Sequence, residues 1–153
     1  MTRRVELGNH RGYAAIGLDH PKTDENVGAV MRAAFCFGAS LVVISGDRLR
    51  PGRTDVYKAW RHIPFQRVDD LYAAIPYNCV PVAVELTENA KPLREYHHPE
   101  RAFYIFGAED GTLGGRILAF CRDVVRVSTR GCLNLAACVN VVLYDREAKN
   151  GDG

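Results

Sequence analysis

Short apolar runs alternate with segments of helical periodicity along this chain. Five runs have the length and the β-branched or aromatic content of buried strands, and they are AAIGL at 14–18, LVVIS at 41–45, VPVAVEL at 80–86, AFYIFG at 102–107 and DVVRV at 123–127. Runs this short and this apolar are typical of strands that are covered on both faces of a sheet.

The segments between these runs predict helices. The first begins near Thr23 or Asp24, which are good N-caps, and ends at Phe37–Gly38, where Gly38 can adopt the left-handed conformation. Shorter helices are expected near 55–61, 69–75 and 114–121, followed by a last helix from about Leu133 to Arg146 and a frayed tail at about 148–153. The alternation predicts an α/β fold with a largely parallel sheet, in one domain that spans residues 1–153.

The composition is that of an ordinary globular protein. No stretch approaches the roughly 20 apolar residues that cross a bilayer, and the amino-terminal MTRRVELGNHRGYAA lacks the apolar core of a signal peptide. The five cysteines form no C-x-x-C pair, so we expect reduced, mostly buried thiols in the cytoplasm. The histidines show no metal-ligand spacing, which predicts no metal site, and His97–His98 is expected to be an exposed loop pair.

Basic residues are concentrated in the first half of the chain. Residues 1–67 contain eleven Lys and Arg against six Asp and Glu, whereas residues 68–153 contain nine against twelve. The densest cluster predicts contacts to a nucleic-acid backbone and comprises Arg48, Arg50, Arg53, Lys58, Arg61 and Arg67. The sequence equally allows a basic face that meets only solvent.

Three predicted strand ends carry the unusual residues of this chain. Ligands of open parallel sheets bind beyond the carboxyl ends of the strands, where the chain has DHPKTDENVGAVMRAAFCFGA at 19–39, GAEDGTLGG at 107–115 and VSTRGCLNLAACVNVVLYD at 127–145. In the first segment, Asn26 and Arg32 lie about 9 Å apart along the helix axis and could bracket one nucleotide. Alternatively, Asn26 caps the helix and Arg32 is a surface charge.

The second and third segments exclude some classes of ligand and reaction. The glycines at 107–115 let backbone N–H groups approach a ligand, but their spacing fits neither G-x-G-x-x-G nor a P-loop. Dinucleotide or ATP binding is therefore disfavoured. Cys132 suggests a nucleophile, but no Cys-His-Asn arrangement can be read from the spacing.

Together these segments resemble the SpoU (TrmH) branch of the SPOUT methyltransferases. NVGAVMRAAFCFGA resembles the first motif of that family, YIFGAEDGTL the second and VRVSTRGCLNLAACVNVVLYDR the third, and the resemblance covers about residues 15–147. It implies a SPOUT-type fold with a parallel sheet and a C-terminal trefoil knot. It also implies a homodimer with an active site shared between subunits, which transfers a methyl group from S-adenosylmethionine to a ribose 2′-hydroxyl of RNA and releases S-adenosylhomocysteine.

The resemblance assigns roles to single residues. The catalytic positions of the family match Asn26, Arg32, Glu109, Cys132 and Asn134. The cofactor-binding positions match Val84, Glu85, Leu86, Phe106, Gly107, Ala108, Gly111, Val127, Cys132 and Leu133. RNA contacts are expected from Arg32, Arg48, Arg50, Arg53, Lys58 and Arg61. Because a guanidinium is not deprotonated in proteins, we expect Arg32 to grip a phosphate and stabilise the developing alkoxide, oriented by Asn26 and Glu109.

The chain departs from the family pattern at two positions. Cys132 stands where the third motif has serine, and Ser128 stands where a proline commonly follows the strand. A thiol is a weaker hydrogen-bond donor than a hydroxyl, which favours the alternative of a non-catalytic knotted RNA-binding protein; an unrelated small-molecule α/β enzyme is a third alternative. No additional N-terminal RNA-binding domain is expected, so recognition would come from the knotted domain and its dimer. The length resembles that of the minimal tRNA wobble-ribose enzymes, but their first motif differs from NVGAVMR, so tRNA and rRNA both stay open as substrates, with tRNA favoured.

Overall fold

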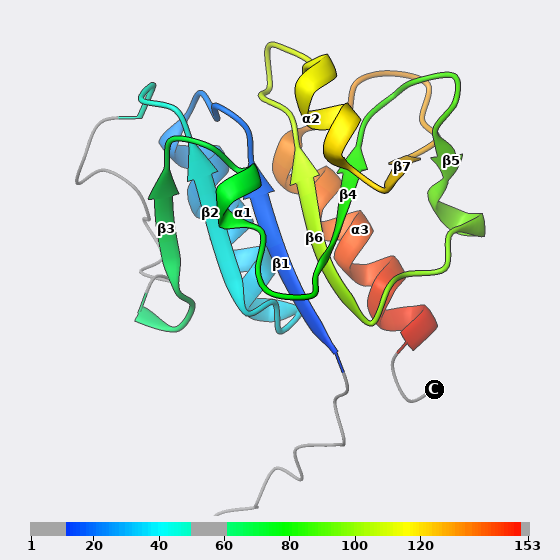
Figure 1. Ribbon diagram of the computed structural model, residues 1–153, viewed down its shortest axis with the longest axis horizontal. Coiled ribbons are helices and arrows are strands. Elements are labelled where there is room, and N and C mark those ends of the chain that lie inside the picture. The colour runs from blue at the N-terminus through cyan, green and yellow to red at the C-terminus, as the bar shows by residue number, and fades with distance from the viewer. Residues whose placement is uncertain (1–11, 50–60, 151–153) are drawn as a thin grey trace, which may run out of the picture.

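The computed structural model describes residues 12–49 and 61–150, which alternate between strands and helices (Figure 1). The strands are β1 (Tyr13–Leu18), β2 (Leu41–Ser45), β3 (Phe65–Val68), β4 (Val80–Val84), β5 (Lys91–Pro92), β6 (Arg101–Phe106) and β7 (Asp123–Arg126). The helices are α1 (Asp24–Cys36), α2 (Gly115–Phe120) and α3 (Leu135–Asn150), with 3-10 turns η2 (Tyr72–Ala74) and η3 (Leu93–Glu95). Every strand runs parallel to its neighbours in one seven-stranded sheet of order β3-β2-β1-β6-β4-β7-β5. The predicted α/β fold with a parallel sheet is confirmed.

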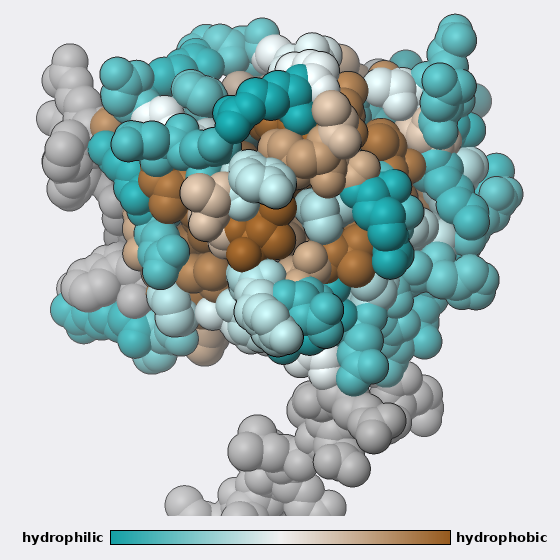
Figure 2. All heavy atoms as spheres, viewed as in Figure 1, coloured by the Kyte–Doolittle hydropathy of each residue, from teal (hydrophilic) through white to brown (hydrophobic). Residues whose placement is uncertain are grey.

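Both faces of the sheet are covered, but not equally. One face packs against α1 and α3, where Val30 and Met31 of α1 and Val139 of α3 join a core around Ile16 and Tyr104. The opposite face, toward the viewer in Figure 1, is covered by α2 and the segment around η2. Figure 2 shows that this cover is thin, because apolar atoms remain visible in the middle of that face.

Helix α1 begins and ends at the residues that the sequence indicates. The Thr23 hydroxyl accepts a hydrogen bond from the Asn26 backbone N–H at 3.3 Å, and Asp24 and Glu25 place negative charge in the first turn. Both features stabilise a helix start. Gly38 follows the helix with φ +72°, a conformation that favours glycine.

Three short elements differ from the sequence-based prediction. Strands β3 and β5 were not expected: β3 is half-exposed, and β5 has two residues, so neither carries a long apolar run. The helix expected at 69–75 is a single 3-10 turn, η2. The helix expected near 114–121 is confirmed as α2, whereas the one expected at 55–61 falls mostly outside the described residues.

The C-terminal helix α3 begins two residues later and ends four residues beyond the predicted limits of 133 and 146. The prediction of a frayed tail from about 148 is wrong as far as Asn150. Contacts with a distant segment explain the longer helix: the Lys149 ammonium donates hydrogen bonds to the carbonyls of Leu93 and Tyr96 at 2.6 and 2.9 Å. Lys149 also pairs with Asp145, one turn earlier in the helix.

Two predictions about buried side chains are wrong in part. His97 is exposed as expected, but the His98 side chain is fully buried. All five thiols are free, yet only Cys79 is buried; Cys121 and Cys138 are half-buried, and Cys36 and Cys132 are exposed. In the part of the chain that the structure describes, no helix has the length and apolarity needed to cross a bilayer.

Strands β4 and β5 are consecutive in the chain, but β7 separates them in the sheet. Residues 85–90 therefore cross from one side of β7 to the other, and residues 93–100 return to β6. After β7 the chain continues into α3, which packs against α1. The segment between β7 and α3 thus comes to lie beside the loops that follow β4 and β6.

Candidate functional site

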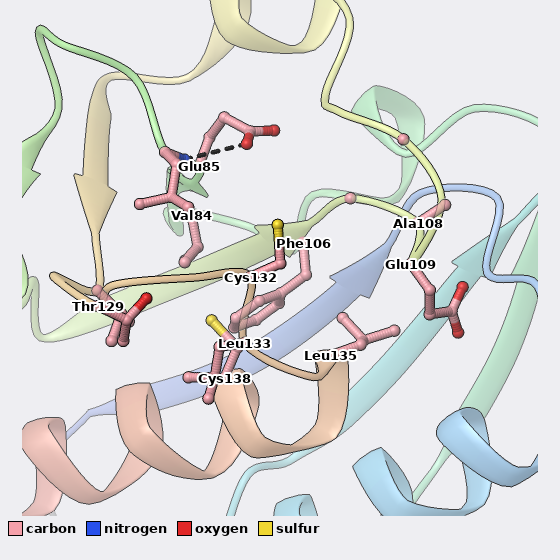
Figure 3. A pocket seen from close by; sticks show the side chains of 14 residues that line it. Val84, Glu85, Phe106, Ala108, Glu109, Thr129, Cys132, Leu133, Leu135 and Cys138 are labelled. Carbon is pink, nitrogen blue, oxygen red and sulfur yellow. Dashed lines mark hydrogen bonds between the residues drawn. The ribbon is translucent and has the colours of Figure 1, made fainter.

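A pocket lies at the carboxyl ends of β4, β6 and β7 (Figure 3). It encloses about 710 Å³ of empty space, which includes open solvent at its mouth. All ten cofactor positions that the sequence predicted line it: Val84, Glu85, Leu86, Phe106, Gly107, Ala108, Gly111, Val127, Cys132 and Leu133. Three segments far apart in the sequence therefore form one cavity.

The walls of this pocket combine apolar side chains with two carboxylates. Phe106, Leu133 and Leu135 contribute apolar surface, and Glu85 and Glu109 are the charged lining residues; Lys, Arg and His are absent from the described lining. Such a lining disfavours a phosphate-bearing ligand and suits a flat apolar group joined to a cation.

Glu85 fixes the glycine loop that follows β6. One oxygen of its carboxylate accepts the Leu113 backbone N–H at 2.8 Å, and the other accepts the Leu86 N–H at 3.0 Å. The loop therefore keeps a defined shape above the pocket.

A chain of hydrogen bonds joins the three motifs along one side of the pocket. The Glu109 carboxylate accepts the Lys22 backbone N–H at 2.9 Å and the Asn26 side-chain amide at 2.8 Å. The Asn134 amide donates to the Asn26 carbonyl oxygen at 3.1 Å, and the Asn134 oxygen accepts the Ala137 N–H at 3.2 Å, which caps the start of α3. The structure thus brings together three of the five predicted catalytic residues: Asn26, Glu109 and Asn134.

The other two predicted catalytic residues differ in position. Cys132 is exposed and lines the pocket, in a loop where the Thr129 hydroxyl donates to the Gly131 carbonyl at 2.6 Å. Arg32 is exposed on α1 and does not line the pocket of its own chain. The hydrogen bonds of Asn26 and Glu109 described above join them to each other and to Lys22 and Asn134. Their role in orienting Arg32 stays a prediction.

The predicted basic RNA contacts are only partly described. Arg48 forms a two-pronged ion pair with Asp110, with N–O distances of 3.0 and 2.8 Å, and this guanidinium lowers the pKa of Asp110 to about 2. The positive charge of Arg48 is therefore already paired with an acidic residue of the glycine loop. Arg61 is exposed, and Arg50, Arg53 and Lys58 lie outside the described residues.

Several residues at the site were not predicted. Thr129, Leu135 and Cys138 also line the pocket, and burial together with the charge of Glu85 raises the pKa of the Cys138 thiol to about 11. Beside the pocket, Asp19 binds the His20 ring at 2.9 Å and accepts the Ser45 hydroxyl at 3.2 Å. The proline-bounded DHP motif is the sequence signal that could have drawn attention to this pair. Among residues 12–49 and 61–150, no group of three metal-ligating side chains occurs.

Comparison with protein families gives an independent result. The model of the family described as "SpoU rRNA Methylase family" matches residues 13–144 of this chain. Among curated proteins, no sequence is significantly similar.

Solved structures resemble the fold over most of its length. A protein solved for the 2-OH methylation of C/U34 on tRNA has a TM-score of 0.78 at 21% identity, covering 90% of this chain and 96% of that chain. The A. aeolicus TrmH/SpoU tRNA modifying enzyme has a TM-score of 0.79 at 14% identity, over 92% and 78% of the two chains. AviRb from Streptomyces viridochromogenes with AdoMet has a TM-score of 0.79 at 18% identity, over 94% and 62%. The protein thus spans less than two thirds of the AviRb chain, and these likenesses concern the fold.

Proposed function

Because this chain belongs to the SpoU rRNA methylase family, we propose that it transfers a methyl group from S-adenosylmethionine to a ribose 2′-hydroxyl of RNA. The observation that carries this proposal is the single pocket formed by all ten predicted cofactor positions, with Glu109, Asn26 and Asn134 bonded along its side. Support for the 2′-hydroxyl comes from the similar protein solved for 2-OH methylation on tRNA. RNA, unlike DNA, offers this hydroxyl.

The pocket residues fit S-adenosylmethionine. Phe106, Leu133 and Leu135 would hold the adenine between apolar surfaces, and Glu85 and Glu109 suit the positive charge of the methionine part. When bound there, the cofactor supplies an activated methyl group. The chain's own residues align the two reactants and exclude water from them.

Arg32 is the residue that we assign to the acceptor nucleotide. A guanidinium cannot act as a base in a protein, so we propose that Arg32 binds the adjacent phosphate and stabilises the alkoxide charge that develops on the 2′-oxygen. Since Arg32 lies outside the pocket of its own chain, we further propose a homodimer in which α1 and α3 pack against their copies and Arg32 reaches the pocket of the other subunit. The exposed Phe35 and Tyr144 on these helices, 52% and 64% accessible, support such an interface.

We also propose that the C-terminal segment forms the trefoil knot of the family. The position of β7 between the consecutive strands β4 and β5 supports this, because residues 85–90 cross from one side of β7 to the other and the chain continues from β7 to α3. The hydrogen bonds of α3 with residues 93–100 would hold the threaded segment in place.

tRNA is the substrate that we favour over rRNA. One similar structure, which this chain covers over 96% of its length, was solved for methylation of C/U34 on tRNA, and this likeness supports tRNA. The basic residues at 48–67 would contact the RNA backbone.

Nucleoside mass spectrometry tests the activity. Purified protein is incubated with S-adenosylmethionine and, separately, with total tRNA and with rRNA, and the nucleosides are searched for a new 2′-O-methyl mark; the matching mark should disappear from a deletion strain. Isothermal titration with S-adenosylmethionine is run in parallel. Cofactor binding and RNA binding without transfer would favour the non-catalytic alternative that the Cys132 substitution suggested, and no cofactor binding at all would overturn the proposal.

A further inference from the structure

The charge of the pocket is one-sided. Of the fourteen described residues that line it, two are acidic and none is basic. A pocket for a phosphate would be expected to show the opposite balance. The sign of this charge therefore restricts the ligands that the pocket prefers.

No ion pair among the described residues neutralises the two carboxylates. Glu85 accepts backbone N–H groups of Leu86 and Leu113, and Glu109 accepts a backbone N–H and the neutral amide of Asn26. These donors are neutral, so they bring no positive charge to either carboxylate. The next acid in the loop is different, because Asp110 is paired with Arg48.

The charge of Glu85 reaches the interior of the pocket. Cys138 lies in the first turn of α3 and lines the pocket from below the loops. Burial raises the pKa of its thiol, and the negative charge of Glu85 raises it further. The negative charge of Glu85 would likewise attract a positive charge placed in the pocket.

We propose that Glu85, together with Glu109, makes this pocket select the cofactor, with its positively charged sulfur, over the product, whose sulfur is neutral. The inference rests on the proposed function. S-adenosylmethionine and S-adenosylhomocysteine share the same nucleoside and amino-acid parts and differ by one methyl group and the positive charge on sulfur. The two carboxylates stabilise the sulfonium and give nothing equivalent to the thioether, so the product leaves readily and inhibits weakly.

Isothermal titration with three ligands measures this selection. The ligands are S-adenosylmethionine, S-adenosylhomocysteine and sinefungin, an analogue that carries an amine in place of the methylated sulfur and is therefore cationic like the cofactor. Wild-type protein is expected to bind both cationic ligands about three- to tenfold more tightly than S-adenosylhomocysteine. The preference should shrink as salt is raised, because it is electrostatic.

Two matched variants identify the residue responsible. Glu85→Gln keeps an acceptor oxygen for the Leu113 N–H and removes the charge, and it should reduce the preference about threefold. Glu88→Gln removes an exposed charge three residues later, outside the pocket lining, and should leave the preference unchanged. Glu109→Gln in the Glu85→Gln background should bring the three affinities close together.

The possible outcomes separate this inference from the proposed function. Equal or tighter binding of S-adenosylhomocysteine by the wild-type protein overturns the selection while leaving a methyltransferase intact. An equal loss of affinity for all three ligands in Glu85→Gln, with unchanged thermal unfolding, also overturns the selection, because Glu85 would then only hold the loop in place. Failure of the wild-type protein to bind S-adenosylmethionine is a failure of the proposed function.

Discussion

The two ends of the sheet use their polar side chains in opposite ways. At the carboxyl ends of the strands, Glu109, Asn26 and Asn134 form a line of hydrogen bonds that stays exposed beside the pocket. Toward the amino ends, the buried His98 lies between the Tyr104 hydroxyl and the Asp145 carboxylate, with N–O distances of 2.7 Å to each. The side chains of the first group can still form hydrogen bonds with a ligand, whereas those of the second group form their hydrogen bonds within the protein.

The buried group favours the neutral form of His98. Arg146 donates to the Tyr104 oxygen at 3.1 Å, which leaves the tyrosine hydroxyl able to donate to the Nδ1 of His98 while the Nε2–H donates to Asp145. A neutral imidazole satisfies this arrangement. Burial lowers the pKa of His98, and the hydrogen bond with Asp145 opposes that shift without reversing it.

The contrast separates stability from function within one small sheet. His98, Arg146 and Lys149 tie α3 to residues 93–100. At the other end, Glu85 and Glu109 form no ion pair with another described residue, so their charge is available to a ligand. Changes at the two ends should therefore affect different measurements.

The largest effect is expected from Arg32→Ala, at the functional end. Loss of phosphate binding and of alkoxide stabilisation should lower turnover about 10²–10³-fold, while the affinity for S-adenosylmethionine and the unfolding temperature stay near wild type. Single-turnover methylation of RNA and isothermal titration measure the two. Arg94→Ala, which removes an exposed arginine outside the pocket, serves as the control; turnover of Arg32→Ala close to that of the control would remove Arg32 from the mechanism.

His98→Ala should have the largest effect on stability. It leaves the Tyr104 hydroxyl and the Asp145 carboxylate without their buried partner, so we expect the free energy of unfolding to fall by about 2–4 kcal/mol. His97→Ala, at the exposed neighbouring position, should change it by less than about 0.5 kcal/mol. Urea unfolding of both variants tests the difference, and equal effects would show that His98 is not a stabilising centre.

The same histidine predicts how stability depends on pH. Because the folded-state pKa of His98 is lowered from its ordinary value, the unfolded chain binds this proton first as the pH falls below about 6.5. The contribution of His98 to stability is therefore complete above that pH and is lost as the pH falls toward the folded-state pKa, with a slope of up to about 1.4 kcal/mol per pH unit. Unfolding of wild type and His98→Gln between pH 7.5 and 5 should show this slope only in the wild type; parallel curves contradict it.

The smallest expected effect is on the rates at which the thiols react, and it can be measured on the wild-type protein. Cys36 and Cys132 are exposed and should react with N-ethylmaleimide at pH 8. Burial raises the pKa of Cys121 to about 12 and of Cys138 to about 11, so these thiols should react slowly.

S-adenosylmethionine should protect Cys132, the exposed cysteine of the pocket. At about ten times its Kd, it should slow labelling of Cys132 about tenfold and leave Cys36, which is outside the pocket, unchanged. Peptide mass spectrometry gives both rates in one sample. Equal labelling of Cys132 with and without the cofactor would mean that the cofactor does not occupy this pocket.

Local patterns in the sequence were enough to predict most of the fold. The runs at 41–45 and 102–107 became β2 and β6 because buried parallel strands need continuous apolar residues, and α1 follows its Thr23 cap and its terminal Gly38. Strands β3 and β5 were missed because their strand character comes from pairing with β2 and β7. The buried state of His98 was missed for a similar reason, because its partner Asp145 lies 47 residues away.

By itself, the sequence determined the alternation of strands and helices and, through three motifs, the residue types of the site. Only the tertiary structure decided which of those residues meet: Asn26 bonds to Glu109 across 83 positions and to Asn134 across 108, and Arg32 stays outside the pocket. The physical reason is that the pattern of apolar residues that predicts a helix or a strand depends only on residues a few positions apart. Hydrogen bonds between side chains and the charge of a pocket depend on how the sheet orders its strands, which no single segment encodes.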